Sequence, residues 1–151
     1  VALDTNEAKF VQGLRVWCEA HPEAEVNLLR NDAATGLGFF EAGNFHPDFL
    51  LWRVDGGRER LAFVDPKGLR NHRPEDDKVT FATKLIPRVQ ERLEKKGSNL
   101  ELSAFLISNT PFGQLRWVEG QEKLTKDKLK AMHVLFDEDD DVVESVMGMM
   151  G

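Results

Sequence analysis

The chain has few of the features that mark secreted or membrane-spanning proteins. It contains 151 residues and one cysteine, Cys18, so no internal disulfide can form and a cytoplasmic location is expected. No apolar run approaches the length of a transmembrane helix, so we expect no membrane partner, and the first residues do not resemble a signal peptide. Because the sequence opens at Val1 instead of methionine, we expect a processed chain or a domain excised from a longer protein.

An excess of positive charge is also lacking. Lysine and arginine total 20 against 26 aspartate and glutamate residues, which gives a net charge of −6. This balance argues against a protein that holds nucleic acid by electrostatics alone. Much of the negative charge lies in one run, Asp137 to Asp141. The hydrophobic fraction of 41% is sufficient for a core, and without an internal repeat or linker we expect one domain over residues 1–151.

Two β-rich runs, residues 49–54 and 59–64, flank the pair Gly56-Gly57. Such a pattern predicts an antiparallel β-hairpin. A turn centred on the two glycines places Asp48 directly opposite Asp65. The Cβ atoms of facing residues lie about 4.5–5.5 Å apart, and like charges at that distance destabilise the pair. A proton or a cation between the two carboxylates would remove the repulsion.

Lys67 follows Asp65 by two residues, so its side chain is expected on the same face of the strand. Two carboxylates and an ammonium on one patch suit metal-assisted hydrolysis. Both faces of the predicted hairpin have apolar residues, which is typical of central strands that are covered on both sides. Pro66 has no N–H to donate, so regular strand pairing is expected to stop there or to form a bulge.

The order Pro47-Asp48, hairpin, Asp65-Pro66-Lys67 resembles the motif of the PD-(D/E)xK nuclease superfamily, which has the restriction-endonuclease-like fold. Segments 44–52 and 61–69 look like the C-terminal nuclease region of type III restriction enzyme Res subunits and related helicase-like proteins, and segments 104–110 and 133–136 look like stretches downstream of it. The resemblance covers residues 5 to 136. It implies an α/β fold with an αβββαβ core, in which helices flank a central mixed sheet.

The resemblance also implies a function, a Mg²⁺- or Mn²⁺-dependent DNA endonuclease domain of a restriction or DNA-defence or repair enzyme. Asp48 and Asp65 would be catalytic residues and metal ligands, with the Pro66 carbonyl as a further oxygen ligand and Lys67 as a catalytic residue. Such hard oxygen donors favour Mg²⁺ or Mn²⁺. The implied partners are DNA and an attached or associated helicase or translocase module. The expected products carry a 5′-phosphate and a 3′-hydroxyl.

Four further residues are candidates for a place in the site. Asp4 and Glu7 have the spacing of a helix N-cap and its capping-box acid, and Glu7 is alternatively a third acid near the metal. Lys84 and Arg88, followed by Arg92, recur every four residues, as on a solvated basic face or on one that follows DNA phosphates. Arg70, in a predicted loop over 68–74, is a further candidate DNA contact.

The remaining chain predicts several more elements. The expected order is a first helix ending near residue 21, an irregular stretch over 23–35, a short strand over 36–41, a helix over 79–93 that Pro87 kinks or divides, a strand over 102–107 parallel to a hairpin strand, a helix over 121–133, an extended piece over 134–136 and a last helix after Asp141. Cys18 is interpreted as a packing residue and His46 as a structural or exposed loop residue.

Two other functions fit the same residues. A non-catalytic nuclease-like module that binds DNA or a protein is favoured by the acidic net charge, but it has no reason to keep facing acids. An unrelated α/β domain, in which Asp65-Pro66-Lys67 is only a turn, does not account for the matched positions of Asp48 and Asp65.

Overall fold

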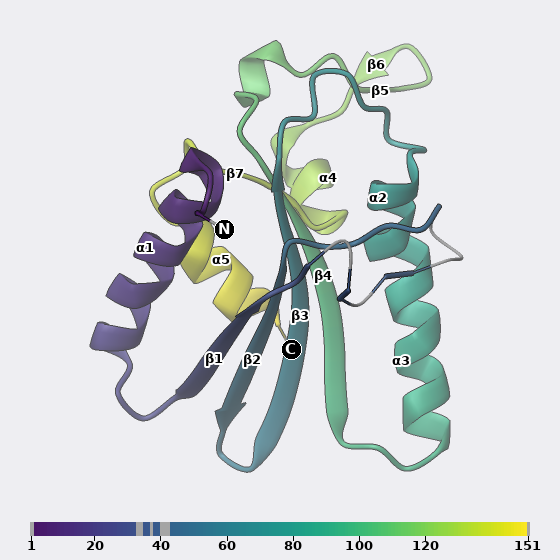
Figure 1. Cartoon of the computed structure of the whole chain (residues 1–151). Coiled ribbons are helices and arrows are strands. Elements are labelled where there is room, and N and C mark those ends of the chain that lie inside the picture. The colour runs from purple at the N-terminus through teal and green to yellow at the C-terminus, as the bar shows by residue number, and fades with distance from the viewer. Residues whose placement is uncertain (1, 33–34, 37, 40–42, 151) are drawn as a thin grey trace.

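A five-stranded sheet in the order β1-β2-β3-β4-β7 forms the centre of the computed structural model, which describes residues 2–32, 35–36, 38–39 and 43–150 (Figure 1). The strands are β1 (Glu25–Arg30), β2 (Phe49–Asp55), β3 (Arg58–Lys67), β4 (Leu100–Ser108) and β7 (Val134–Phe136). The pairs β1–β2 and β2–β3 are antiparallel, whereas β3–β4 and β4–β7 are parallel. The predicted α/β class with a central mixed sheet is therefore confirmed.

Helices cover both faces of the sheet (Figure 1). On one face lie α1 (Thr5–Ala20) and α5 (Val142–Met149), and on the other a helical stretch made of α2 (Asp77–Thr80), the π-helical turn η2 (Phe81–Leu85) and α3 (Ile86–Lys95). The smaller elements η3 (Phe112–Gln114), β5 (Val118–Glu119), β6 (Glu122–Lys123) and α4 (Lys126–Ala131) follow β4. The parallel strands β3 and β4 are thus joined through the α2–η2–α3 crossover, as predicted.

Alternate residues of the hairpin pack into two separate cores. Phe49, Leu51, Ala62 and Val64 pack with α1 and α5, while Leu61 and Phe63 pack with Phe81, Ala82 and Ile86 of the crossover. Both faces of β2 and β3 are therefore buried, as the sequence predicts. Asp65 continues the Leu61 and Phe63 face, so its side chain emerges where the crossover begins.

The β2–β3 turn has the conformation that fixes the register of the hairpin. Gly56 and Gly57 have φ angles of 53° and 75°, which are readily available only to glycine and are typical of a two-residue hairpin turn. Pairing runs from Asp55↔Arg58 to Phe49↔Val64, as expected for a turn centred on the glycines. The next residues beyond this register are Asp48 and Asp65.

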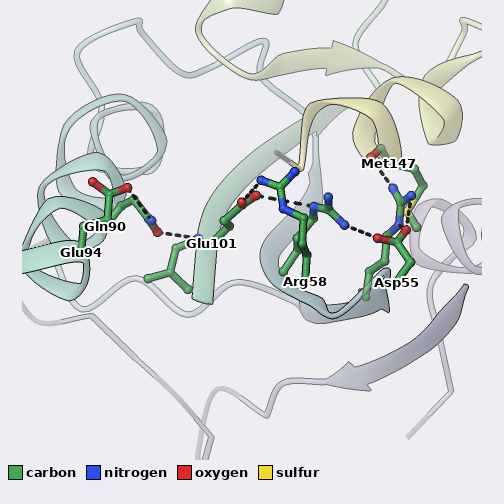
Figure 2. A network of polar contacts seen from close by, with 9 residues as sticks. Asp55, Arg58, Gln90, Glu94, Glu101 and Met147 are labelled. Atoms are coloured by element: carbon green, nitrogen blue, oxygen red, sulfur yellow. Dashed lines mark hydrogen bonds and ion pairs between the residues drawn. The ribbon is translucent and has the colours of Figure 1, made fainter. Parts of the chain in front are cut away.

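A network of charged side chains holds this turn against the rest of the molecule (Figure 2). Asp55 accepts hydrogen bonds from Arg53 at 2.6 Å and from Arg60, which is buried. These contacts hold the pKa of Asp55 below its usual value. Arg53 also donates to the Met147 carbonyl at 2.8 Å, and Glu101 of β4 pairs with Arg60 at 3.5 Å. The network lies at the opposite end of β3 from Asp65, so it supports the fold and does not belong to the candidate site.

Two predicted elements are wrong. Residues 25–30, predicted to be irregular, form the edge strand β1, in which only Val26 and Leu28 are partly covered by the core. The helix predicted over 121–133 is confined to Lys126–Ala131, where Thr125 caps its first turn, and the residues before it form the β5–β6 hairpin. The strand predicted over 36–41 includes residues outside the described part of the chain, and Phe39 makes one isolated bridge to Phe45.

The two proline predictions have different outcomes. Pairing of β3 with β2 stops at Val64, before Pro66, as expected, but pairing with β4 continues through Pro66 to Lys67. Pro87 lies just after the π-helical turn, and the helical stretch continues through it into α3. Because proline has no N–H to donate to the preceding turn and its ring crowds the carbonyl four residues before it, regular α-helical bonding is interrupted at this point.

Candidate functional site

Asp48 and Asp65 meet at the end of the β2–β3 hairpin. The Asp48 backbone N–H donates to Oδ1 of Asp65 at 3.2 Å. The Asp48 carbonyl accepts from Asn31 N–H at 2.7 Å, which holds the residue in line with β1. Asp65 is 1% exposed, so its carboxylate is almost completely removed from water. The structure therefore brings together the two acids that the hairpin register pairs in the sequence.

The pKa of Asp48 shows that two neighbouring carboxylates at this place destabilise the charged form of the residue. Burial, and after it the neighbouring Asp65 carboxylate, raise the pKa of Asp48 from 3.8 to about 7. The Lys67 ammonium opposes this shift, while Glu7 adds weakly to it. A carboxyl group with such a pKa holds a proton at neutral pH for much of the time. The pair is thus a place where a proton, or a cation in its stead, relieves repulsion between two carboxylates.

Two lysines supply positive charge to the pair. Lys67 is exposed at the end of β3 and is close enough to Asp48 to lower its pKa. Lys78, in α2, places its Nζ 3.4 Å from Oδ2 of Asp65 and 5.4 Å from the centre of the Phe45 ring. Burial is the main cause that lowers the pKa of Lys78. The salt bridge of Asp65 is made by Lys78, whereas Lys67 forms no ion pair with any described residue.

Glu7 lies at the edge of the same site and has structural contacts of its own. Asp4 and Glu7 form a complete capping box, in which the Asp4 N–H donates to Glu7 Oε2 and the Glu7 N–H donates to Asp4 Oδ1, both at 2.8 Å. Arg30 of β1 pairs with the Glu7 carboxylate at 3.1 Å. The capping interpretation is confirmed. The buried Glu7 carboxylate also contributes to the raised pKa of Asp48, so Glu7 remains a candidate third acid of the site.

The candidate DNA-binding residues are all exposed. Lys84 and Arg88 point to solvent from η2 and α3, and neither forms an ion pair with a described residue. Arg70 lies in the loop after β3, where its guanidinium donates to Gln114. An α-helix rises about 1.5 Å per residue, so Arg88 lies about 15 Å along the crossover from Lys78. These residues could follow a nucleic-acid backbone away from the acid pair.

A cavity of about 580 Å³ opens beside Lys78. Its walls include Phe45, His46, His72 and Asp77. His46 is half-buried, and its Nδ1 atom is enclosed without a hydrogen-bond partner among the described residues. The position of His46 agrees with the prediction of a structural loop residue. Cys18 packs against the core of α1, as predicted.

Sequence reasoning missed Lys78 and Arg30. Lys78 follows Asp65 by 13 residues, and it reaches the site because the loop after β3 turns α2 back against the strand end. The sequence offers only a weak hint of this contact, a lysine at the start of the helix that follows the Asp65-Pro66-Lys67 strand, and the hint does not give the path of the loop between them. Arg30 was missed because β1 was not predicted, although the alternation of Val26 and Leu28 is a weak strand signal.

The donor set fits a hard divalent cation of the kind the sequence implies. Across residues 2–32, 35–36, 38–39 and 43–150, no three His, Cys, Asp or Glu side chains gather so as to hold a metal ion. Magnesium is commonly bound through only one or two carboxylates, with waters and substrate phosphates completing its shell. Asp48 and Asp65 meet that minimum, and the Asp65 carboxylate is, after burial, the main cause that raises the pKa of Asp48.

No helix of the described residues is long and apolar enough to cross a membrane.

Comparisons with known proteins assign no family to this chain. No family model, curated protein or solved structure matches it.

Proposed function

We propose that this chain is a metal-dependent DNA endonuclease domain with a restriction-endonuclease-like core. The observation that carries the proposal is the pairing of half-buried Asp48 with buried Asp65, next to two lysines, at the end of a central hairpin. The element order α1-β1-β2-β3, helical crossover, β4 supports it, because it follows the αβββαβ order that the sequence resemblance implies. The proposed setting is a restriction or DNA-defence or repair enzyme of the cytoplasm, with a helicase or translocase as partner.

Each residue has a distinct task in this proposal. Asp48 and Asp65 would hold a Mg²⁺ or Mn²⁺ ion, with the Pro66 carbonyl as a further oxygen ligand. When bound, such an ion polarises the scissile phosphate and acidifies a water molecule. Lys67 orients that water or stabilises the negative charge that grows on the phosphorus centre. Water loses a proton and adds to phosphorus, the bond to the 3′-oxygen breaks, and that oxygen takes up a proton, which leaves a 5′-phosphate and a 3′-hydroxyl.

Lys67→Ala tests this assignment. The side chain is exposed and forms no ion pair with a described residue, so its removal should leave the fold intact. We expect plasmid nicking with Mg²⁺ or Mn²⁺ to fall about 10²–10³-fold, as when one preorganised electrostatic contact to a transition state is lost. Lys95→Ala, which removes an exposed lysine paired with Glu91 on α3, is the control and should cut like the native protein.

The outcome distinguishes this function from its alternative. Full activity of folded Lys67→Ala, checked by circular dichroism, would remove Lys67 from the mechanism. The acidic net charge of −6 favours a second candidate, a non-catalytic module that binds DNA or a protein. In that case neither the native chain nor any variant would nick DNA at any concentration of divalent ion.

A further inference from the structure

Lys78 occupies a place at Asp65 that a metal ion would also need. Its Nζ atom lies 3.4 Å from Oδ2 of Asp65, while Oδ1 of the same carboxylate accepts from the Asp48 N–H at 3.2 Å. Both oxygens of this buried carboxylate thus have a donor. Of these two donors only Lys78 carries a charge, so it is the cation that offsets the burial of Asp65.

The surroundings of Lys78 hold its ammonium in this position. Its side chain is 21% exposed and runs over the Phe45 ring, with the Nζ atom 5.4 Å from the ring centre. The second lysine of the site, Lys67, acts on Asp48, whereas Lys78 contacts Asp65, so the ion pair of the buried acid is with Lys78. The cavity of about 580 Å³ that Lys78 helps to line gives the ammonium a second place to go.

We propose that Lys78 is the resident counter-ion of the acid pair, which weakens divalent-cation binding until a phosphate of DNA takes up its ammonium. The inference rests on the proposed function, since it needs both a metal and DNA at this site. A positive charge next to a ligand carboxylate repels an incoming dication and shares its ligand. A phosphate oxygen neutralises that charge, so DNA strengthens metal binding, and metal strengthens DNA binding by the same factor.

The test measures metal affinity and needs no turnover. Calcium binding is titrated calorimetrically, with and without a short DNA duplex, for the native chain and for Lys78→Gln. Glutamine keeps a donor for Oδ2 of Asp65 but removes the charge. Without DNA, Lys78→Gln should bind calcium about tenfold more tightly than the native chain. The increase in calcium affinity that DNA causes should shrink by a similar factor in the variant.

Further variants keep the inference falsifiable. Lys78→Arg retains the charge and should behave like the native chain, and Lys78→Met serves in place of Lys78→Gln if the latter does not fold. Lys95→Met is the control for loss of an exposed lysine elsewhere. Calcium binding that is equal or weaker in Lys78→Gln would overturn this inference alone. Absence of calcium binding by the native chain and all variants would overturn the proposed function as well.

Discussion

At the scale of single residues, Asp48 and Asp65 differ although both are aspartates on one patch. Asp65 is buried with a donor on each oxygen, whereas Asp48 has a carboxyl group whose pKa is raised to about 7 by burial and by Asp65. The repulsion that Asp48 feels from the Asp65 carboxylate is opposed only in part by Lys67. This remaining repulsion is the physical basis for expecting a cation there.

Asp48→Asn should stabilise the metal-free protein at neutral and alkaline pH. The folded-state pKa of about 7 lies above the ordinary 3.8, so the native state holds a proton that the unfolded chain releases. The contribution of Asp48 to stability is therefore greatest below pH 3.8 and is lost as the pH rises to about 7. At pH 8 we expect the variant to gain about 1–2 kcal/mol, with solvent screening allowed for.

The measurement is urea unfolding in chelator between pH 4 and pH 8, where pH 4 is about the ordinary pKa of aspartate. Glu59→Gln is the matched control, because Glu59 is an exposed acid of the same strand, β3. The gain should shrink towards pH 4 in Asp48→Asn and be absent at every pH in Glu59→Gln. If Asp48→Asn were less stable than the native chain at pH 8, the claim that the Asp48 and Asp65 carboxylates repel each other in the folded protein would be contradicted.

The sequence was enough to predict the site residues whose positions follow from strand pairing. It was not enough for those whose positions follow from tertiary contacts. The register from Gly56-Gly57 places Asp48 opposite Asp65 because side chains in a two-stranded ladder have fixed partners. Lys78 was not predictable in the same way. Its contact with Asp65 depends on how the loop after β3 returns α2 to the sheet, and no local pattern encodes that path.

At the scale of elements, the β2–β3 hairpin determines the geometry of the site. Its turn has φ angles of 53° and 75° at Gly56 and Gly57, and the strand register set by this turn places Asp48 and Asp65 side by side at the far end of the hairpin. The charged network around Asp55 holds the same turn from outside (Figure 2). The position of the acid pair is thus determined by contacts at both ends of one hairpin.

Gly57→Ala should lower the stability of the chain by about 1–2 kcal/mol, because an L-residue with a side chain is strained at a left-handed φ. For a protein of this size the midpoint of thermal unfolding should fall by about 2–8 °C. Gly113→Ala is the control, since the space around Gly113 is open and its φ is not positive. Equal midpoints for Gly57→Ala and the native chain would show that the turn tolerates another conformation.

The elements that sequence reasoning missed are those with weak patterns. The edge strand β1 has core contacts on one face only and includes an exposed Leu29, so its alternation is poor. The β5–β6 hairpin has two residues in each strand, and all four are exposed. By contrast, β4 contains the uninterrupted apolar run Ala104 to Ile107, and the strand was found within two residues at its start and one at its end.

At the scale of the whole molecule, charge is distributed unevenly. The net charge is −6, yet Lys84 and Arg88 of the crossover are exposed, and no ion pair links either to another described residue. The proposed DNA path therefore runs from the acid pair along the η2–α3 face. Weak binding by the 151-residue chain alone is expected, because few phosphates are neutralised.

Replacing Lys84 and Arg88 together by alanine should weaken DNA binding in calcium without changing thermal stability. Loss of two phosphate contacts should reduce the slope of log affinity against log salt by about 1–2. Fluorescence anisotropy with a labelled duplex measures both quantities. Lys95→Ala, whose ammonium pairs with Glu91, is the control on the same helix. An unchanged salt slope in the double variant would place the DNA on another face.

The central claim, that Asp48 and Asp65 form a metal site, is tested most directly by a crystal of the chain soaked in Mn²⁺. The account predicts an anomalous peak about 2.1 Å from a carboxylate oxygen of each residue, the distance that small hard dications take. In the same crystal the Lys78 Nζ should lie farther from Asp65 than its present 3.4 Å. The peak should be absent from Asp65→Asn crystals soaked in the same way. Native crystals with Mn²⁺ bound elsewhere, but with no peak between Asp48 and Asp65, would contradict the account.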